Sequence, residues 1–371
     1  MIYRIEYSAV QSLIEALHER KYTVIGPIRR EGSIVYDELQ SSVDLPKGWT
    51  DEQGPGYYRT RERSDGALFG FSVGPHSWKK YLYPPILKLV VAARKVKGFA
   101  VSNWNTAEEE QKPLAFLGVR PCELAAITIQ DKVFGSGDYQ DPNYKKVRDK
   151  LFVVAVNCSS SAETCFCNSM GTGPKARGKF DLALTEILEK TVPYYLVEVG
   201  STRGQEVLAG LAHRPAERSE LERGEEIIGH VAKEMKRSID TSGIKELLYS
   251  SAEHREWEKV GERCLTCANC TMVCPTCFCN TVEDSTDLSG SEAVRTRKWD
   301  SCFTLDFSYI HGGSVRTSAK ARYRQWMTHK LAAWIDQFGT SGCVGCGRCI
   351  TWCPVGIDIT DEARVVRENN V

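Results

Sequence analysis

Two cysteine runs share one spacing and one following proline. Their residues are Cys264, Cys267, Cys270, Cys274 and Pro275 in the first run, and Cys343, Cys346, Cys349, Cys353 and Pro354 in the second. Both read C-x2-C-x2-C-x3-C-P, a spacing that binds 4Fe–4S clusters. The alternatives are zinc ribbons and a disulfide framework, but two such runs, each with an even spacing and a proline, fit zinc poorly. The spacing therefore predicts two 4Fe–4S clusters and a chain that carries electrons.

The ligand sets of these two clusters are expected to be crossed. Three thiolates wrap one cluster, whereas the fourth lies on the turn that follows and is placed for the neighbouring cluster. The predicted sets are Cys264, Cys267, Cys270 and Cys353 for one cluster, and Cys343, Cys346, Cys349 and Cys274 for the other.

Seven of the fifteen cysteines lie outside these runs. Thr164-Cys165-Phe166-Cys167-Asn168 is repeated as Thr276-Cys277-Phe278-Cys279-Asn280. In an extended segment the side chains at i and i+2 point the same way, so both thiols can face one metal. We expect Cys122, Cys158, Cys165 and Cys167 to hold a third 4Fe–4S cluster; burial as small apolar side chains is the alternative.

Cys277, Cys279 and Cys302 are only three thiols near two clusters already supplied with ligands. For these we expect packing and supporting roles around the clusters, with direct ligation as the alternative.

Length and charge bound the remaining possibilities. The chain has 371 residues, enough for two domains, and 48 basic against 48 acidic residues, so no global field favours nucleic acid or an anionic membrane. The first residues carry charges where a signal peptide needs an apolar core, and we find no apolar stretch of about 18–20 residues. We expect a cytoplasmic protein without nucleic-acid binding or membrane insertion.

The first part of the chain, residues 1–245, is predicted to be an α/β domain with a mixed or largely parallel sheet. Helices are expected at 8–19, 123–130 and 182–188, and strands at 22–28, 33–36, 114–119, 151–156 and 194–199. Cys122 and Cys158 follow the strands 114–119 and 151–156, where open α/β sheets place their chemistry.

Residues 246–371 are predicted to form a mainly α-helical, ferredoxin-like domain with the two clusters. Helices are expected at 214–237, which would connect the domains, and at 244–262 and 318–338. The basic and aromatic stretch 322–330 is expected to offset cluster charge and to dock a partner.

Other cofactors lack a motif. The chain contains neither a Walker A run nor a Rossmann fingerprint, and Gly171-Thr172-Gly173-Pro174 is expected to be a loop that fixes the cysteines. No flavin-binding motif is present, so we expect no flavin.

Several stretches resemble a known family over most of the chain. They include Gly118-Val119-Arg120-Pro121-Cys122-Glu123, Asn157-Cys158, Arg297-Lys298-Trp299-Asp300-Ser301-Cys302 and Gly342-Cys343-Val344-Gly345-Cys346-Gly347-Arg348-Cys349. The chain is similar to the beta, iron–sulfur subunit of soluble NiFe hydrogenases (sulfhydrogenases) and to the A subunit of anaerobic sulfite reductases.

The resemblance implies a role in anaerobic metabolism as a relay within a heteromeric oxidoreductase. The implied partners are a flavin/NAD(P)-binding subunit and a catalytic subunit of the NiFe hydrogenase or sulfur/sulfite reductase type, so that this chain is not itself the site of substrate chemistry. Two alternatives remain: a flavin-containing oxidoreductase subunit with its own substrate site in the first domain, and an iron–sulfur regulatory or scaffold protein.

Overall fold

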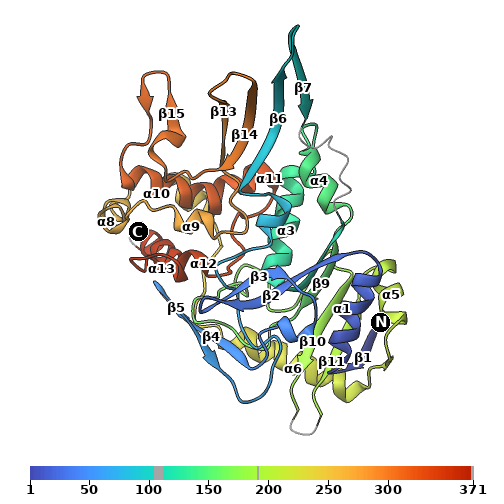
Figure 1. The fold of residues 1–371 in the computed structure, drawn as a ribbon. Helices are drawn as coiled ribbons and strands as arrows, with labels where there is room; N and C mark the ends of the chain where they lie inside the picture. The colour runs from blue at the N-terminus through green and yellow to red at the C-terminus, as the bar shows by residue number, and fades with distance from the viewer. Residues whose placement is uncertain (104–111, 190–191, 369–371) are drawn as a thin grey trace.

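The largest sheet contains both parallel and antiparallel strands. The computed structural model describes residues 1–103, 112–189 and 192–368, and in it eight strands follow the order β12-β1-β11-β10-β9-β8-β2-β3 (Figure 1). Their bounds are β1 Ile2–Glu6, β2 Thr23–Arg30, β3 Ser33–Glu38, β8 Leu114–Val119, β9 Phe152–Val156, β10 Leu182–Ile187, β11 Tyr194–Val199 and β12 His213–Pro215. The pairs β2/β8, β8/β9 and β9/β10 are parallel, and the other pairs are antiparallel. The predicted mixed sheet is therefore confirmed.

The helix expected at 182–188 is wrong, because residues Leu182–Ile187 form the central strand β10. All six residues of β10 are buried. Because both faces of β10 are covered, apolar and polar residues do not alternate along it, and its sequence lacks the pattern that distinguishes a strand from a helix.

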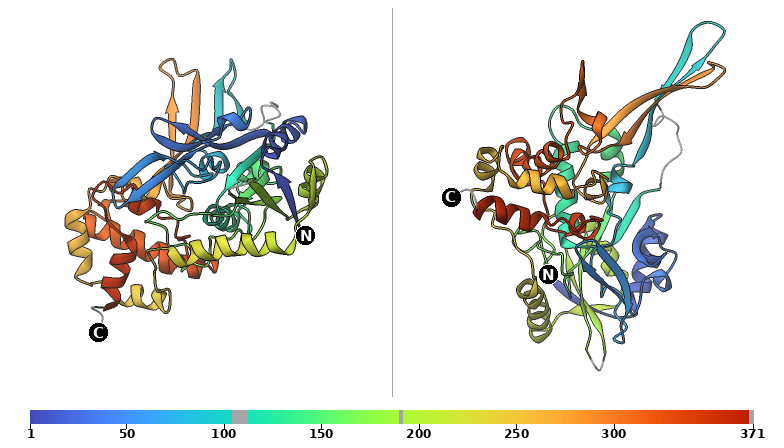
Figure 2. Two further views of the ribbon diagram at one scale, coloured as in Figure 1. Left: turned by 90° about the horizontal axis from the view of Figure 1, so that it is seen from below. Right: turned by 90° about the vertical axis from the view of Figure 1, so that its left-hand side faces the viewer.

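Helices cover both faces of this sheet. The bounds are α1 Ala9–Glu19, α3 Pro121–Phe134, α4 Pro142–Arg148, α5 Thr202–Ala209 and α6 Arg218–Glu234. Along β9, Phe152, Val154 and Val156 pack with α1 and α5, whereas Val153 and Ala155 pack with α3 and α4. An apolar core therefore lies on each face of the sheet. Figure 2 shows the sheet and the helices that cover it from two further directions.

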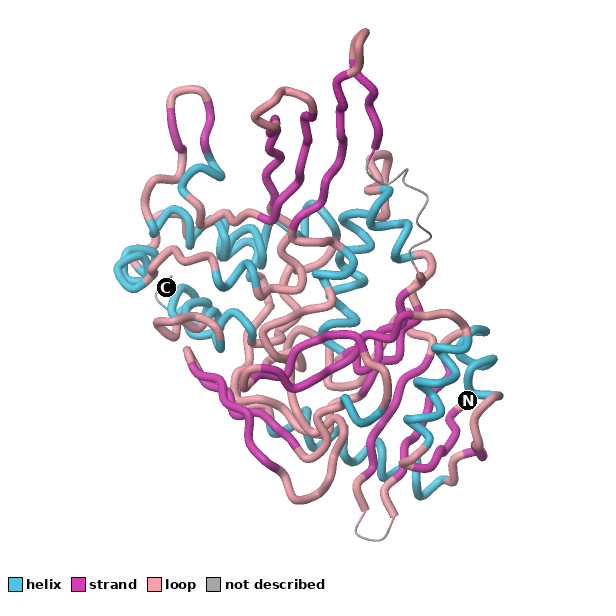
Figure 3. The backbone as a smooth tube through the Cα atoms, viewed as in Figure 1, coloured by secondary structure: helices cyan, strands magenta, loops and turns pink. Residues whose placement is uncertain are grey.

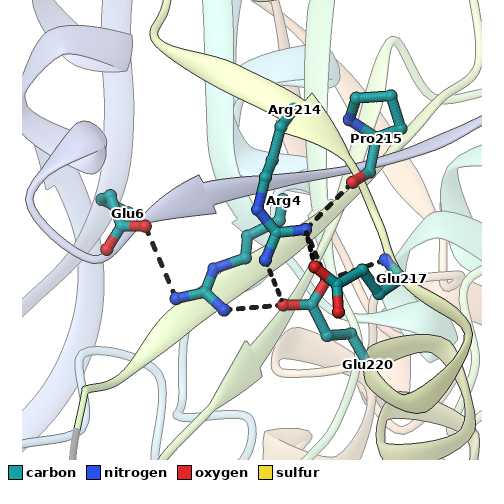
Figure 4. A network of polar contacts seen from close by, with 6 residues as sticks. All are labelled: Arg4, Glu6, Arg214, Pro215, Glu217 and Glu220. Atoms are coloured by element: carbon teal, nitrogen blue, oxygen red, sulfur yellow. Dashed lines mark hydrogen bonds and ion pairs between the residues drawn. The ribbon is translucent and has the colours of Figure 1, made fainter.

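Helix α6 is fixed to the sheet edge by an arginine pair. Arg4 of β1 and Arg214 of β12 both donate to Glu220 Oε1, each at 2.6 Å (Figure 4). Burial alone would raise the pKa of Glu220, but hydrogen bonds from Arg214 and Arg4 lower it to about 2. The ionised carboxylate therefore ties the start of α6 to β1 and β12 at neutral pH.

A second sheet joins the two parts of the chain. Its order is β13-β14-β6-β7, with bounds β6 Ile86–Arg94, β7 Phe99–Asn103, β13 Asn280–Thr286 and β14 Glu292–Trp299. Its hairpins project from the body beside the hairpin of β15 Tyr309–Ile310 and β16 Gly313–Ser314 (Figure 3). The boundary at 245/246 stays a prediction, and strand pairing crosses it.

The C-terminal part contains these strands as well as helices, so its predicted mainly helical character is not confirmed. Its helices are α7 Ile244–Ser250, α8 Glu256–Arg263, α9 Asn269–Met272, α10 Ala319–Thr328, α11 Trp334–Phe338, α12 Arg348–Thr351 and α13 Ile359–Glu368. The single helix expected over 244–262 is divided between α7 and α8, where the Trp257 indole donates to Ser251 O at 2.7 Å.

The remaining regular elements are short. They are the hairpin β4 Trp49–Gly54 and β5 Tyr57–Glu62, helix α2 Lys79–Leu82, 3-10 turns at Ser42–Asp44 and Leu305–Ser308, and a π-helical turn at His329–Ala333. Within the described ranges, no helix has the length and apolar character needed to cross a membrane.

Candidate iron–sulfur sites

The four thiols of the first predicted ligand set line one cavity. Cys264, Cys267 and Cys270 come from the loop before α9 and from α9 itself, and Cys353 follows α12. Burial, and then the charges of Cys264 and Cys353, raise the pKa of Cys270. Residues about 80 positions apart in sequence are therefore brought together as crossed ligation requires; ligation itself stays a prediction.

Two unpaired hydrogen-bond donors belong to this cavity. Tyr323 and Trp326 of α10 line it, and the Tyr323 hydroxyl and Trp326 Nε1 are buried without a partner among the described residues. A buried donor without an acceptor costs about 1–3 kcal/mol. The sulfides and thiolates of a cluster accept hydrogen bonds, so the residues present fit such a group. The aromatic residues of the 322–330 stretch thus lie inside the protein and not on a docking surface.

The second predicted set gathers around a buried lysine. Burial raises the pKa of Cys343 to about 12, with Cys346 and Cys274 close enough to contribute. Lys330 lies in the π-helical turn, is 4% exposed, and donates to Cys274 Sγ at 3.4 Å and to Gly342 O at 3.2 Å. A buried ammonium requires negative charge nearby, which the thiolates of a cluster would supply.

The N-terminal set forms where strands β8 and β9 end. Cys122 lies in the first turn of α3, directly after β8, and Cys158 follows β9. Burial, and then the charges of Cys165 and Cys158, raise the pKa of Cys167. Burial likewise raises the pKa of Cys122, with Cys167 the next cause. All four predicted residues of this set are therefore neighbours, and the third cluster stays a prediction.

The loop that carries Cys165 and Cys167 packs against the second cysteine motif. Phe166 N donates to Gly345 O at 2.9 Å, and Thr172 Oγ1 donates to Val344 O at 2.7 Å. Gly345 has φ +64°, and a Cβ there would lie 2.6 Å from the Cys167 backbone. Only glycine allows this approach, which sets the N-terminal thiols beside Cys346.

Two buried arginines complete this region. Arg120 and Arg348 are at most 1% exposed. Arg120 donates to Phe69 O and Phe71 O, both at 2.6 Å, and its guanidinium hydrogen-bonds the Cys158 thiol. Arg348 hydrogen-bonds the Cys346 thiol. Arg120 Nε and Arg348 Nη1 are buried without a partner in the described part of the chain, and cluster sulfur would accept from them.

Glu123 is a site residue that the sequence did not identify. Its carboxylate accepts from Arg348 Nη2 at 2.5 Å, from the Tyr36 hydroxyl at 2.6 Å and from Trp78 Nε1 at 3.0 Å. The pair Glu123–Arg348 is fully buried and links the start of α3 to α12. The signal in the sequence was a charged residue inside each cysteine motif, at Cys122-Glu123 and at Arg348-Cys349.

The loop 171–174 holds cysteines, as the sequence predicts. Cys158 N donates to Pro174 O at 3.2 Å, and Gly173 leaves no room for a Cβ, which would lie 2.8 Å from Cys167 Sγ.

The remaining three cysteines lie beside the second set. Cys277 hydrogen-bonds the Cys274 thiol, and the thiol of Cys302 donates to the sulfur of Cys279. Within residues 1–103, 112–189 and 192–368, no three cysteine, histidine or carboxylate side chains are arranged to hold a single metal ion. That geometry concerns one ion, whereas in a cubane each thiolate binds a different iron.

The chain is similar to known iron–sulfur proteins. Residues 263–357 match the family described as "4Fe-4S dicluster domain". The chain is 30% identical over 348 residues to "Sulfhydrogenase 2 subunit beta" of Pyrococcus furiosus, with 92% of each chain covered. No solved structure matches the chain. The chain carries a 4Fe–4S dicluster domain and belongs to the family of the sulfhydrogenase beta subunit.

Proposed function

We propose that this chain is the electron-transfer iron–sulfur subunit of a heteromeric, hydrogenase-like oxidoreductase. In this proposal the crossed sets hold two 4Fe–4S clusters, and Cys122, Cys158, Cys165 and Cys167 hold a third. The P. furiosus relative is by name a subunit of a sulfhydrogenase, which supports a place in such a complex. A cytoplasmic location is part of the proposal, because fifteen free cysteines suit a reducing compartment.

One observation carries this proposal: the three thiol sets adjoin one another in a row. Cys270 of the first set is close enough to contribute to the raised pKa of Cys349 in the second set, after burial. Cys346 of the second set is likewise close enough to contribute to the raised pKa values of Cys122, Cys165 and Cys167. Electrons could therefore pass from one end of the row to the other through neighbouring centres.

Each 4Fe–4S cluster, when bound, supplies a one-electron carrier. The chain's own residues hold and surround it. Thiolates bind the irons, Arg120 and Arg348 donate hydrogen bonds to thiol sulfurs, and Lys330 provides positive charge beside Cys274. Such hydrogen bonds and charges would stabilise the reduced, more negative state of a bound cluster and so raise the reduction potential of that cluster.

The first set marks the accessible end of the row. Cys267 is exposed, whereas Cys122, Cys165, Cys167, Cys274, Cys343 and Cys346 are buried. Leu265 and Val355, which line the same cavity, are exposed apolar residues. A partner that docks here would meet the Cys264 set first, and we assign this end to exchange with a neighbouring subunit.

The crossed ligation is tested by comparing Cys353→Ala with Cys349→Ala. The proposal expects paramagnetic resonance of the reduced variants to show damage to different clusters: the Cys264 set in Cys353→Ala and the Cys343 set in Cys349→Ala. The same cluster altered in both variants would show that the ligand sets are not crossed.

The relay role is tested by anaerobic dye reduction. The isolated holo chain is expected to exchange electrons with artificial dyes but to leave NAD(P)H unoxidised until a flavin/NAD(P)-binding partner is added, because the clusters take one electron at a time and a hydride carries two. Robust NAD(P)H oxidation by the chain alone would reject the relay.

A cavity favours a second candidate, a flavin-containing subunit with its own substrate site. It measures about 890 Å³ and includes Tyr7, Arg29, Lys47, Trp49 and Leu68 in its lining. It lies where β1 and β2 end, and Arg29 stacks over the Trp49 ring at 3.7 Å. A flavin absorption spectrum that survives gel filtration of the chain and disappears in Trp49→Ala would favour this candidate.

A further inference from the structure

Cys279 and Cys302 meet at the base of the β13–β14 hairpin. Asn280, the first residue of β13, pairs with Trp299, the last residue of β14, and Asp300 N donates to Cys279 O at 2.9 Å. The two cysteines flank this paired end of the hairpin. The thiol of Cys302 and its backbone N–H both hydrogen-bond the sulfur of Cys279. The paired end of the hairpin therefore places two free thiols within hydrogen-bond reach of each other.

This thiol pair lies close to both ligand sets of the dicluster domain. Cys270 of the first set is close enough to affect Cys302. Cys277, two residues from Cys279, hydrogen-bonds Cys274 of the second set. One-electron carriers bound by these sets would therefore be neighbours of the pair.

Two buried lysines place positive charge near the pair, and Asp300 opposes this charge at Cys279. Lys79 is 3% exposed, donates to Cys277 O at 3.1 Å and lies over the Trp299 ring at 3.9 Å. The charge of Lys330 reaches both Cys279 and Cys302. Hydrogen bonds from Cys302 lower the pKa of Cys279 to about 7, against the opposing effect of burial. Thiolate is the reactive form of cysteine, and nearby cations favour it.

We propose that Cys279 and Cys302 form a redox-active dithiol that closes to a disulfide and exchanges two electrons with the neighbouring iron–sulfur clusters. On oxidation both sulfurs lose their protons to solvent and one S–S bond forms. The two electrons pass one at a time to oxidised clusters, which a partner protein then reoxidises. Reduction reverses each step. The electron supply rests on the proposed relay, but the bond itself does not.

Such a pair adds two-electron capacity to a row of one-electron carriers. Both thiols are only partly buried, so protons can be exchanged with solvent, whereas Cys122 and Cys167 are buried. Structural thiols in an apolar core are inert, whereas these two thiols are partly exposed and lie near each other and near Lys330.

The test is anaerobic redox titration of the holo chain, followed by trapping of its thiols. The protein is equilibrated in buffers of reduced and oxidised dithiothreitol, denatured in the presence of a maleimide and digested with trypsin. Cys279 falls in peptide 264–295 and Cys302, alone, in peptide 299–316. The two peptides should be joined at oxidising ratios and separately alkylated at reducing ratios, along a two-electron Nernst curve.

Matched variants identify the partner thiol. Cys279→Ser should abolish the joined peptides, whereas Cys277→Ser should preserve them, and both should keep the iron content of the unsubstituted chain. Peptides that stay separate at every ratio would overturn the proposal. A loss of about four irons in Cys279→Ser would overturn it as well, because the residue would then be a cluster ligand. Iron content and dye reduction test the relay independently, so failure of the dithiol leaves the relay standing.

Discussion

The same five residues, Thr-Cys-Phe-Cys-Asn, occur in both halves of the chain and have different surroundings. In the first copy, Phe166 is fully buried in a core made of residues from the C-terminal half, and Cys165 and Cys167 adjoin Cys158. In the second copy, Phe278 packs against Phe134 of α3, and Cys279 contacts Cys302. Phe166 is thus inserted into the other half, whereas Phe278 contacts Phe134 of the other half and His329, Trp334 and Phe338 of its own.

The difference between the copies comes from their neighbours and not from the copies themselves. The first copy meets two more thiols at the ends of β8 and β9, together with the guanidinium groups of Arg120 and Arg348. The second meets two further thiols, Cys274 of the second ligand set and Cys302, together with two lysines. The four thiols around the first copy belong to neither dicluster ligand set and suit a cluster of their own. Around the second copy Cys274 is already assigned to the second set, and the remaining pair of Cys279 and Cys302 suits dithiol chemistry. An identical local sequence therefore supports two different roles.

The largest expected effect separates the copies by iron content. Cys167→Ser should reduce the iron of the anaerobically purified chain from about twelve atoms to about eight, since it removes a thiolate of the third cluster. The matched change Cys279→Ser should leave about twelve. Iron and acid-labile sulfide analysis checks both variants. Equal iron in the two variants would remove the proposed distinction between the loops.

Substituting the two phenylalanines should lower the stability of the chain by different amounts, because Phe166 is buried more deeply than Phe278. Phe166→Ala should destabilise the chain by about 3–5 kcal/mol, because it leaves a cavity in a fully buried site. Phe278 is partly exposed, so Phe278→Ala should cost about 1–2 kcal/mol. Guanidinium unfolding of the two holo variants, followed by tryptophan fluorescence, measures the shift in midpoint. A larger shift for Phe278→Ala would contradict this ranking.

Close packing of the first copy against the second cysteine motif is tested at Gly345. Gly345→Ala should cost about 2–4 kcal/mol, since its Cβ meets the Cys167 backbone and its φ is positive. Gly339→Ala is the control: its φ is +66° and a Cβ there meets nothing within 4 Å, so only the backbone cost of about 1–2 kcal/mol applies. Thermal unfolding of the two holo variants measures the loss of stability in each. Equal losses of stability would mean that the contact between Gly345 and the Cys167 loop does not stabilise the chain.

The smallest expected effect concerns the charge beside the second ligand set. Lys330→Gln should make one cluster potential more negative while the others stay unchanged, because a cation stabilises the reduced, more negative cluster. Lys245→Gln, at a surface ion pair with Asp336, is the control and should change none. Potentiometric titration followed by paramagnetic resonance measures both. An unchanged set of potentials in Lys330→Gln would show that the lysine is only structural.

Much of the architecture near the sites could be predicted from local patterns. The strands 114–119 and 151–156 and the helix after Cys122 are confirmed, because buried strands and the residues that end them have short-range signals. The cysteine spacing indicated the 4Fe–4S dicluster domain, which the family match to residues 263–357 confirms. Strand β10 was mistaken for a helix, since a strand buried on both faces shows no alternation.

The sequence by itself determined the 4Fe–4S dicluster domain, because cluster binding depends on thiols at fixed short separations along one loop. Only the tertiary structure decided which distant residues surround those thiols. The pairing of β14 with β6, the salt bridge between Glu123 and Arg348, and the contact of Cys279 with Cys302 join residues far apart in the chain or across a hairpin. Such contacts arise from packing of whole elements, and their partners leave no regular spacing in the sequence from which they could be predicted.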